Sequence, residues 1–226
     1  RDPEMSRGLG DVYKRQVLCS KFKRTMTNKL LFFVLLALCF SGCDMLETHP
    51  YDVHITGERE LTNKNIQLIE NKMQGKKTIR FAMISDTQRW YNSTEDVVKA
   101  LNARGDIDFV IHGGDQSDFG VTKEFIWMRD IFNKFQMPYV CLLGNHDCLG
   151  TGEDAYRAIY GDPNFAFTAG NVRFICLNTN AMEYDYSEPV PDFNFIENEL
   201  NNLSPEIEKT VFAMHVKPFE FVFNNN

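Results

Sequence analysis

Four short stretches of this 226-residue chain combine carboxylate, amide and imidazole side chains. They are Asp86-Thr-Gln88, Gly-Gly-Asp115-Gln-Ser-Asp118, Gly-Asn145-His146-Asp147 and the separate His215. Carboxylate and amide oxygens, together with imidazole nitrogen, suit hard or borderline divalent cations. A structural zinc site would be built around cysteine, which these stretches do not contain. The four stretches therefore predict a metal centre.

Each stretch directly follows an apolar run that reads as a β-strand. We expect strands at 77–85, 107–114, 138–145 and 209–216, and a hairpin from 165–170 and 172–180 that turns at Gly170-Asn171. Patterns typical of helices lie between the strands, at 63–75, 93–105, 121–136, 152–161 and 192–203. Strands that alternate with helices predict an α/β fold, and continuous apolar strands suit a sheet covered on both faces.

The predicted elements would bring the four stretches together. In α/β sheets, ligands bind outside the carboxyl ends of the strands, so parallel neighbours would place all four polar stretches on one rim. Asp86 and Gln88 are two residues apart and would face the same way on an extended backbone. Asp86 alone would more often be a turn residue, and Gln88 could instead hydrogen-bond a water.

Taken together and in order, D-x-Q, GGDQSD, GNHD and MHVKP resemble the motifs of calcineurin-like metallophosphoesterases, over about residues 78–218. The resemblance implies two packed, mixed β-sheets flanked by helices, with the metals at the rim. It also implies hydrolysis of phosphate mono- or diesters by a hydroxide activated by two divalent ions (Mn, Fe, Zn or Mg).

The same resemblance assigns roles to individual residues. Asp86 and Gln88 would bind the first metal, Asp115 would bridge both, and Asn145 and His215 would bind the second. His146 would act beside the phosphate as general acid or stabiliser, and Asp118 would orient it. Asp147 matches the motif in a supporting role.

Two departures from the family pattern concern the metals. Gln88 stands where many members have His, which favours manganese, iron or magnesium over zinc. The family also has a GHxH motif after the position of His215, and the 11 residues that follow His215 do not contain one. We therefore expect a domain that is truncated at its C-terminus and leaves an open sheet edge. These departures also suggest an alternative, an envelope lipoprotein that binds a phosphorylated ligand or partner without catalysis.

Other polar and aromatic residues have less specific readings. His112 lies on the opposite strand face from Asp115 and reads as a packed histidine. Trp90 with its neighbours Arg89 and Tyr91, and the loop of Tyr184, Asp185 and Tyr186, would either line a substrate pocket or be ordinary loop residues. Of the cysteines outside the leader, Cys141 and Cys176 read as buried thiols, and Cys148 has no zinc-ligand partner in sequence.

The N-terminal residues read as a leader. A basic stretch precedes eleven apolar residues at 30–40, and Ser-Gly-Cys43 follows. This pattern is typical of a signal peptide, and its end resembles a bacterial lipoprotein cleavage site with Cys43 as the lipidated residue. An ordinary secretory signal or an uncleaved anchor are the alternatives. We expect a non-native leader at 1–25, a signal peptide at 26–43, a tether and short helix at 44–75, and the phosphoesterase domain at 76–226.

The expected partners follow from charge and location. The chain has 24 basic and 31 acidic residues and a net charge of −7, which argues against an extended nucleic-acid surface. We expect a phosphorylated substrate, and attachment to the membrane of the bacterial cell envelope through the lipid at Cys43.

Overall fold

The structure is a computed structural model that describes residues 29, 31–33, 49–181 and 190–217. The chain divides into residues 1–49 and a compact unit from Pro50 onward, and the elements below belong to the second unit. The predicted lipidation site Cys43, nearly all of the signal peptide, and the loop of Tyr184–Tyr186 lie outside the described residues. Among the described residues, no helix is both long enough and apolar enough to cross a membrane.

The first sheet contains three parallel strands in the order β1-β2-β3. They are β1 (Phe81–Ile84), β2 (Phe109–His112) and β3 (Tyr139–Cys141). Helices α3 (Tyr91–Arg104) and α4 (Thr122–Phe132) form the crossovers between them. The strands are shorter than predicted, but their order and the intervening helices agree with the predicted α/β alternation.

The second sheet is mixed. Strand β4 (Phe165–Ala169) pairs antiparallel with β5 (Val172–Leu177), and β5 pairs parallel with β6 (Lys209–Met214). The predicted hairpin turn is present. Gly170 has a φ of 57°, and a Cβ added at this residue would lie only 2.2 Å from the Lys76 carbonyl oxygen. Only this sheet is mixed among the described strands. The expected two sheets flanked by helices are present, and the described strands of the first sheet are all parallel because helical crossovers join them.

Aromatic side chains fill the space between the two sheets. Phe109 of β2 meets Phe167 and Phe174 edge to face, with ring centroids 5.6 and 5.5 Å apart. Phe167 and Phe174 stack on each other at 4.9 Å. All three rings are buried, so this layer fixes the first sheet against the second and confirms two packed sheets.

Helix α2 (Leu61–Met73) joins both sheets. The Asn65 side-chain oxygen accepts a hydrogen bond from the Tyr139 backbone N–H of β3 at 3.2 Å. The Glu70 carboxylate accepts one from the Thr168 backbone N–H of β4 at 3.0 Å. Ile69 and Met73 contribute to the apolar layer between the sheets.

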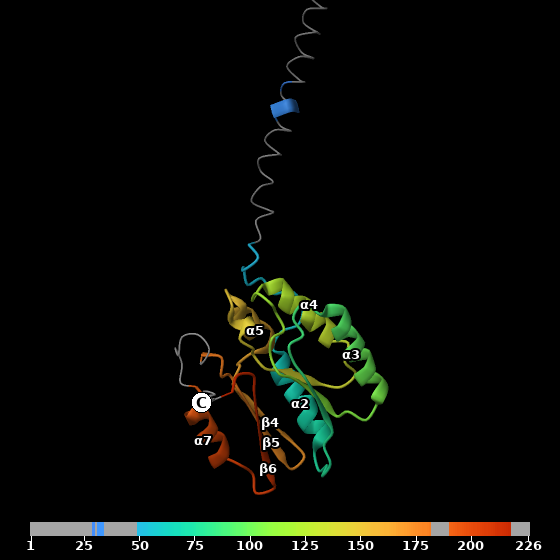
Figure 1. Ribbon diagram of the computed structural model, residues 1–226, viewed down its shortest axis with the longest axis vertical. Helices are drawn as coiled ribbons and strands as arrows, with labels where there is room; N and C mark the ends of the chain where they lie inside the picture. Colours follow the sequence, from blue (N-terminus) through green and yellow to red (C-terminus); the bar gives the residue numbers. More distant parts are fainter. Residues whose placement is uncertain (1–28, 30, 34–48, 182–189, 218–226) are drawn as a thin grey trace, which may run out of the picture. The chain divides into compact units, whose positions relative to one another are not determined.

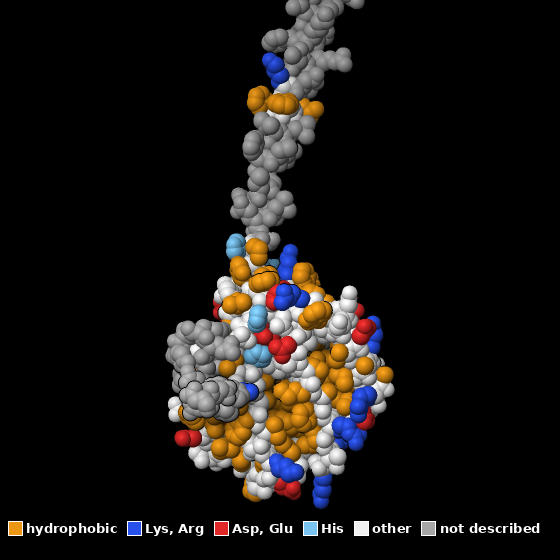
Figure 2. All heavy atoms as spheres, in the orientation of Figure 1, with side chains coloured by type: hydrophobic (Ala, Val, Ile, Leu, Met, Phe, Trp, Pro, Cys, Tyr) orange, Lys and Arg blue, Asp and Glu red, His pale blue; other side chains and the backbone are white. Residues whose placement is uncertain are grey.

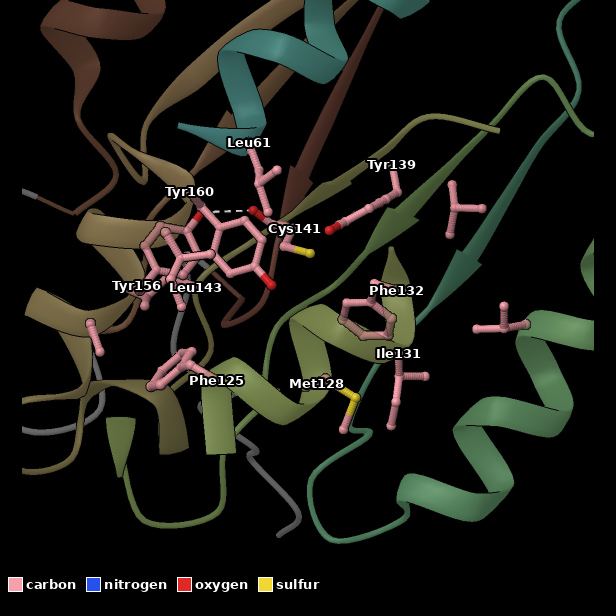
Figure 3. Packing of buried hydrophobic residues seen from close by; sticks show 14 of the residues in the cluster. Leu61, Phe125, Met128, Ile131, Phe132, Tyr139, Cys141, Leu143, Tyr156 and Tyr160 are labelled. Carbon is pink, nitrogen blue, oxygen red and sulfur yellow. Dashed lines mark hydrogen bonds between the residues drawn. The ribbon is translucent and has the colours of Figure 1, made fainter. Parts of the chain in front are cut away.

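The other face of the first sheet is covered by α3, α4 and α5 (Gly152–Tyr160), whereas the second sheet and α7 (Phe193–Asn201) lie on the opposite side (Figure 1). The cluster under the helices includes Phe125, Phe132, Tyr139 and Tyr156 (Figure 3). The Tyr156 hydroxyl donates to the Cys141 carbonyl at 2.6 Å, so its buried polar atom is satisfied.

Residues 55–58, which precede α2 and lie in the range where a tether was expected, pack against the domain. Ile55 is 4% exposed and belongs to the core under the helices. The buried Arg129 of α4 donates to the backbone carbonyls of Thr56 and Glu58 at 2.6 and 3.2 Å. The packed domain therefore begins before residue 76.

Strand β1 is an edge strand among the described strands. Phe81 and Met83 of this strand are 37% and 56% exposed, although the Phe81 ring stacks on Phe109, whereas every residue of the central strand β2 is buried. An exposed apolar edge of this kind is where a further strand would pair.

Candidate metal centre

The ends of three strands bring acidic and imidazole groups together. Asp86 follows β1, Asp115 follows β2, and His215 follows β6 of the second sheet. One ligand atom from each lies within 4.8 Å of the other two. On the face of the molecule in Figure 2, His and acidic side chains lie beside one another, above a broad hydrophobic area. The candidate site therefore lies where the two sheets meet.

The backbone between the first two strand ends is tightly connected. The Asp86 N–H donates to the Gly114 carbonyl at 3.0 Å, and the N–H groups of Thr87 and Gln88 donate to the Asp115 carbonyl at 3.1 and 3.2 Å. Asp86 and Asp115 have positive φ angles of 57° and 61°. This left-handed conformation is unfavourable for residues with a Cβ, and it occurs here at the two acidic residues of the cluster.

His215 points a lone pair into the cluster. Its Nδ1 lies 2.8 Å from the Gly113 carbonyl oxygen, which accepts only if Nδ1 carries the proton. Nε2 then faces the Asn145 side-chain oxygen at 2.9 Å and an Asp115 carboxylate oxygen at 3.5 Å. In this tautomer the Nε2 lone pair faces two oxygens, and such a group of nitrogen and oxygen atoms fits a divalent cation. A backbone carbonyl that holds the second imidazole nitrogen is typical of a metal-binding histidine.

The Gln88 side chain supplies an oxygen that lacks a hydrogen-bond donor. Its amide nitrogen lies 3.5 Å from Asp115 Oδ2, while its Oε1 is buried and has no hydrogen-bond partner among the described residues. Burial raises the pKa of Asp115, and the neighbouring His215 acts in the opposite direction. Leaving a buried oxygen without a donor is costly, so this arrangement also fits a bound cation.

Asp147 holds the backbone of the site but does not face the cluster. One carboxylate oxygen accepts from the N–H groups of Asp115 and Gly144 at 2.9 and 3.0 Å. The other accepts from those of Gln116 and Ser117 at 2.9 and 2.8 Å. Asp147 is 0% exposed, and burial raises its pKa to about 7 while the bonds from Ser117 and Gly144 lower it. It therefore ties the loop after β2 to the loop after β3.

His146 lies beside the cluster, and its side chain is 39% exposed. Its backbone N–H donates to Asp115 Oδ1 at 3.0 Å. Its Nδ1 donates to the Asp118 backbone carbonyl at 2.9 Å, whereas the nearer Asp118 carboxylate oxygen is 3.8 Å away. The bond from Nδ1 to this carbonyl raises the pKa of His146. The structure thus places Asp118 next to His146, with the backbone making the shorter contact.

The Asp118 carboxylate instead approaches Arg89. Its Oδ2 lies 3.2 Å from Arg89 Nε, and the Arg89 side chain is 68% exposed. Arg89 also has a positive φ of 64°. Nothing in the sequence signals this pair, since the two residues are far apart along the chain and the turn contains no glycine.

His112 is packed between the first two strand-end loops, as predicted for a residue on the other strand face. It is 1% exposed, and its Nε2 donates to the Thr87 hydroxyl at 2.9 Å. Its Nδ1 accepts from the Gly114 N–H at 3.2 Å. Burial lowers the pKa of His112 to about 3, and the nearby His215 lowers it further. Sequence patterns predicted the burial, but not the bridge to Thr87 and Gly114.

The remaining predicted residues have different surroundings. Trp90 is 66% exposed and lines a hollow with Asp86, whereas Tyr91 is half-buried and meets Trp127 edge to face at 5.8 Å. Cys141 and Cys176 are buried free thiols, as predicted, and the Cys148 thiol donates to the Gly144 carbonyl at 3.3 Å.

Comparisons with known proteins identify a family and two similar proteins. A sequence model of the calcineurin-like phosphoesterase family matches residues 79–225. A 3′,5′-cyclic-nucleotide phosphodiesterase from Nostoc sp. (strain PCC 7120) is 27% identical over 124 residues, which cover 54% of this chain and 46% of that protein. A purple acid phosphatase, PPD1 from yellow lupin (Lupinus luteus) seeds, is structurally similar with a TM-score of 0.47 and 17% identity. That match covers 62% of this chain and 30% of the phosphatase, so the chain spans less than half the length of either protein.

Proposed function

The chain belongs to the calcineurin-like phosphoesterase family, and from this premise we propose that it hydrolyses phosphate mono- or diesters at the cluster of Asp86, Asp115 and His215. The observation that carries the proposal is the convergence of ligand atoms at the strand ends. One atom each of Asp86, Asp115 and His215 lies within 4.8 Å of the other two, and imidazole nitrogen with carboxylate oxygen is a donor set that divalent cations take.

We assign the ligands of two divalent ions by combining the family resemblance with these contacts. Asp86 and Gln88 would hold one ion, Asn145 and His215 the other, and Asp115 lies next to both pairs. Mn, Fe, Zn and Mg all accept such oxygen and nitrogen ligands. When bound, the ions would supply a water of lowered pKa and would neutralise charge on the phosphoryl group.

The residues of the chain then have distinct tasks. The Asp147 carboxylate fixes the two loops that carry Asp115 and Asn145. The Asp118 carbonyl accepts the Nδ1 proton of His146 and raises its pKa, which favours the imidazolium form, and in that form Nε2–H of this half-exposed ring can protonate the departing alkoxide. Arg89 partly neutralises the Asp118 carboxylate and offers its exposed guanidinium at the rim.

The experiment measures turnover and metal binding separately in the 226-residue chain. We expect manganese-dependent release of p-nitrophenol from p-nitrophenyl phosphate or its diester, with a 3′,5′-cyclic nucleotide assayed in parallel. His146→Ala should lower kcat for the cyclic nucleotide, whose departing alkoxide must take up a proton, about 10²–10⁴-fold, the usual contribution of a general acid, and should leave manganese binding by calorimetry intact. Asp115→Asn should weaken both, because its carboxylate lies next to both ligand pairs.

Two exposed residues provide matched controls. His54→Ala and Asp96→Asn repeat the same chemical changes away from the cluster and should leave turnover and metal binding unchanged. Full activity in both His146→Ala and Asp115→Asn would contradict the proposed site. The non-catalytic alternative is not favoured by the family match or by the phosphodiesterase relative.

A further inference from the structure

A hollow of about 330 Å³ opens directly beside the candidate metal centre. Its lining includes Asp86, and the carboxylate of this residue belongs to the cluster with Asp115 and His215. The other residues along it include Ile84 and Thr87 at the end of β1, and Trp90, Thr94 and Val97 at the start of α3. The hollow is therefore close enough to receive the alcohol part of an ester whose phosphate lies at the metal centre.

Trp90 lines this hollow from a fixed backbone. Its N–H donates to the Thr87 carbonyl at 3.1 Å. Its own carbonyl accepts from both the N–H and the hydroxyl of Thr94, each at 2.8 Å. The side chain is nevertheless 66% exposed. A single exposed aromatic residue is ordinary on a protein surface, but this one lines a hollow that also contains Asp86, a candidate ligand of the metal centre.

The lining also limits the chemistry of the bound group. Among the described residues that line it, Asp86 alone is charged, and the rest are aliphatic, aromatic or hydroxyl-bearing. None of these described residues is a lysine or arginine that could receive a second phosphate or a carboxylate. Flat apolar rings gain most from such a surface, because they stack on the indole and bury area against Ile84 and Val97.

We propose that this hollow is the subsite for the alcohol part of the substrate, and that it selects phosphate esters whose alcohol carries a flat aromatic group, such as an aryl ring or a nucleobase. This inference rests on the proposed phosphoester hydrolysis and adds the substrate class to it. Trp90 is its specificity-determining residue.

The kinetic test compares benzyl phosphate with ethyl phosphate, whose alcohols are similar leaving groups but differ in the ring. In the metal-loaded chain, Trp90→Ala should raise KM for the benzyl ester about three- to tenfold, the range expected for a lost aromatic contact, and should leave kcat unchanged. KM for the ethyl ester should change less than twofold, and Trp90→Phe should restore most of the preference. Trp127→Ala is the matched control, because this second exposed tryptophan lies outside the lining.

A binding test gives the answer independently of turnover. The chain has two tryptophans, so Trp127→Phe leaves Trp90 as the only indole fluorophore. In the presence of Zn²⁺, benzylphosphonate should change its emission at a concentration at least threefold lower than ethylphosphonate does.

The outcomes separate the two proposals. If neither ester is hydrolysed but the fluorescence still distinguishes the two phosphonates, the proposed hydrolysis fails and the subsite stands. If both esters are hydrolysed and Trp90→Ala affects them equally, the subsite is refuted and the hydrolysis stands. Equal responses of the Trp90 emission to both phosphonates would also refute the subsite.

Discussion

His112 should make the stability of the protein depend on pH in a specific window. It is fully buried between the loops that carry Asp86 and Asp115, where its Nδ1 accepts from the Gly114 N–H. A protonated imidazole has no acceptor, so acid must either break this bond or unfold the protein. The folded pKa is about 3, against an ordinary value of 6.5.

The sign and size of the effect follow from these two pKa values. Below pH 6.5 the unfolded chain binds a proton at His112 that the folded chain does not bind, so the free energy of unfolding falls as the pH decreases towards 3. Between about pH 7.5 and about pH 5.0, protonation of His112 in the unfolded state changes the free energy of unfolding by an amount equivalent to roughly 1.5 pKa units. At 1.36 kcal/mol per unit, the contribution of His112 decreases by about 2 kcal/mol.

Urea unfolding at a series of pH values measures this contribution. Other carboxylates and histidines titrate in the same range, so the informative quantity is the difference between the wild-type chain and His112→Gln. Glutamine still offers an N–H to the Thr87 hydroxyl but has no titrating group. The variant should lose about 2 kcal/mol less than wild type between the two pH values, even if it is less stable at both.

The control is His54→Gln, which replaces an exposed histidine and should leave the wild-type pH dependence unchanged. Identical pH dependence in wild type and His112→Gln would refute the reasoning, because it would mean that His112 is not held neutral in the folded protein.

Two further substitutions test how the site is held together. Asp147→Asn would turn an amide NH₂ towards two of the four backbone N–H groups and should cost at least about 2 kcal/mol of unfolding free energy in urea. Asp192→Asn, the same change at the N-cap of α7, should cost a few tenths, since Asn caps as well as Asp; equal losses would argue against the role of Asp147. Gly144→Ala would place a Cβ 2.2 Å from the backbone nitrogen and Oδ1 of Asp115 and should cost about 2–3 kcal/mol and weaken manganese binding by calorimetry. Gly75→Ala meets no atom within 4 Å and should cost about 1 kcal/mol from its positive φ without affecting the metal, so a smaller loss at Gly144 than at Gly75 would contradict the predicted clash.

Sequence patterns predicted the elements well because the hydrophobic period is local information. The strands before Asp86 and Asp115, the helices between them and the turn at Gly170 all follow from runs of apolar residues and from glycine. The predicted start of α3 was wrong, since the helix was expected from residue 93. The helix begins at Tyr91, and the Thr94 hydroxyl donates back to the Trp90 carbonyl within the first turn.

The contacts that shape the site could not be predicted in the same way. Asp147 binds backbone groups about thirty residues earlier in the chain. The ion pair of Arg89 with Asp118 depends on a left-handed turn at Arg89, and this turn contains no glycine from which it could be predicted. Such contacts depend on how two loops are placed in space, and hydrophobic periodicity carries no information about that. The pairing of β6 with β5 could not be predicted either, because a strand with the same apolar pattern can join either sheet.

The left-handed backbone at Asp86 and Asp115 has a consequence for protein engineering. Glycine and asparagine are the residues that tolerate this conformation best, so a design method that rewards folding stability alone would tend to replace both aspartates. Each replacement would relax the chain and remove an acidic side chain from the cluster. Thermostable versions of this domain must therefore find their gains elsewhere, in the helices and the aromatic layer, and leave these two unfavourable residues in place.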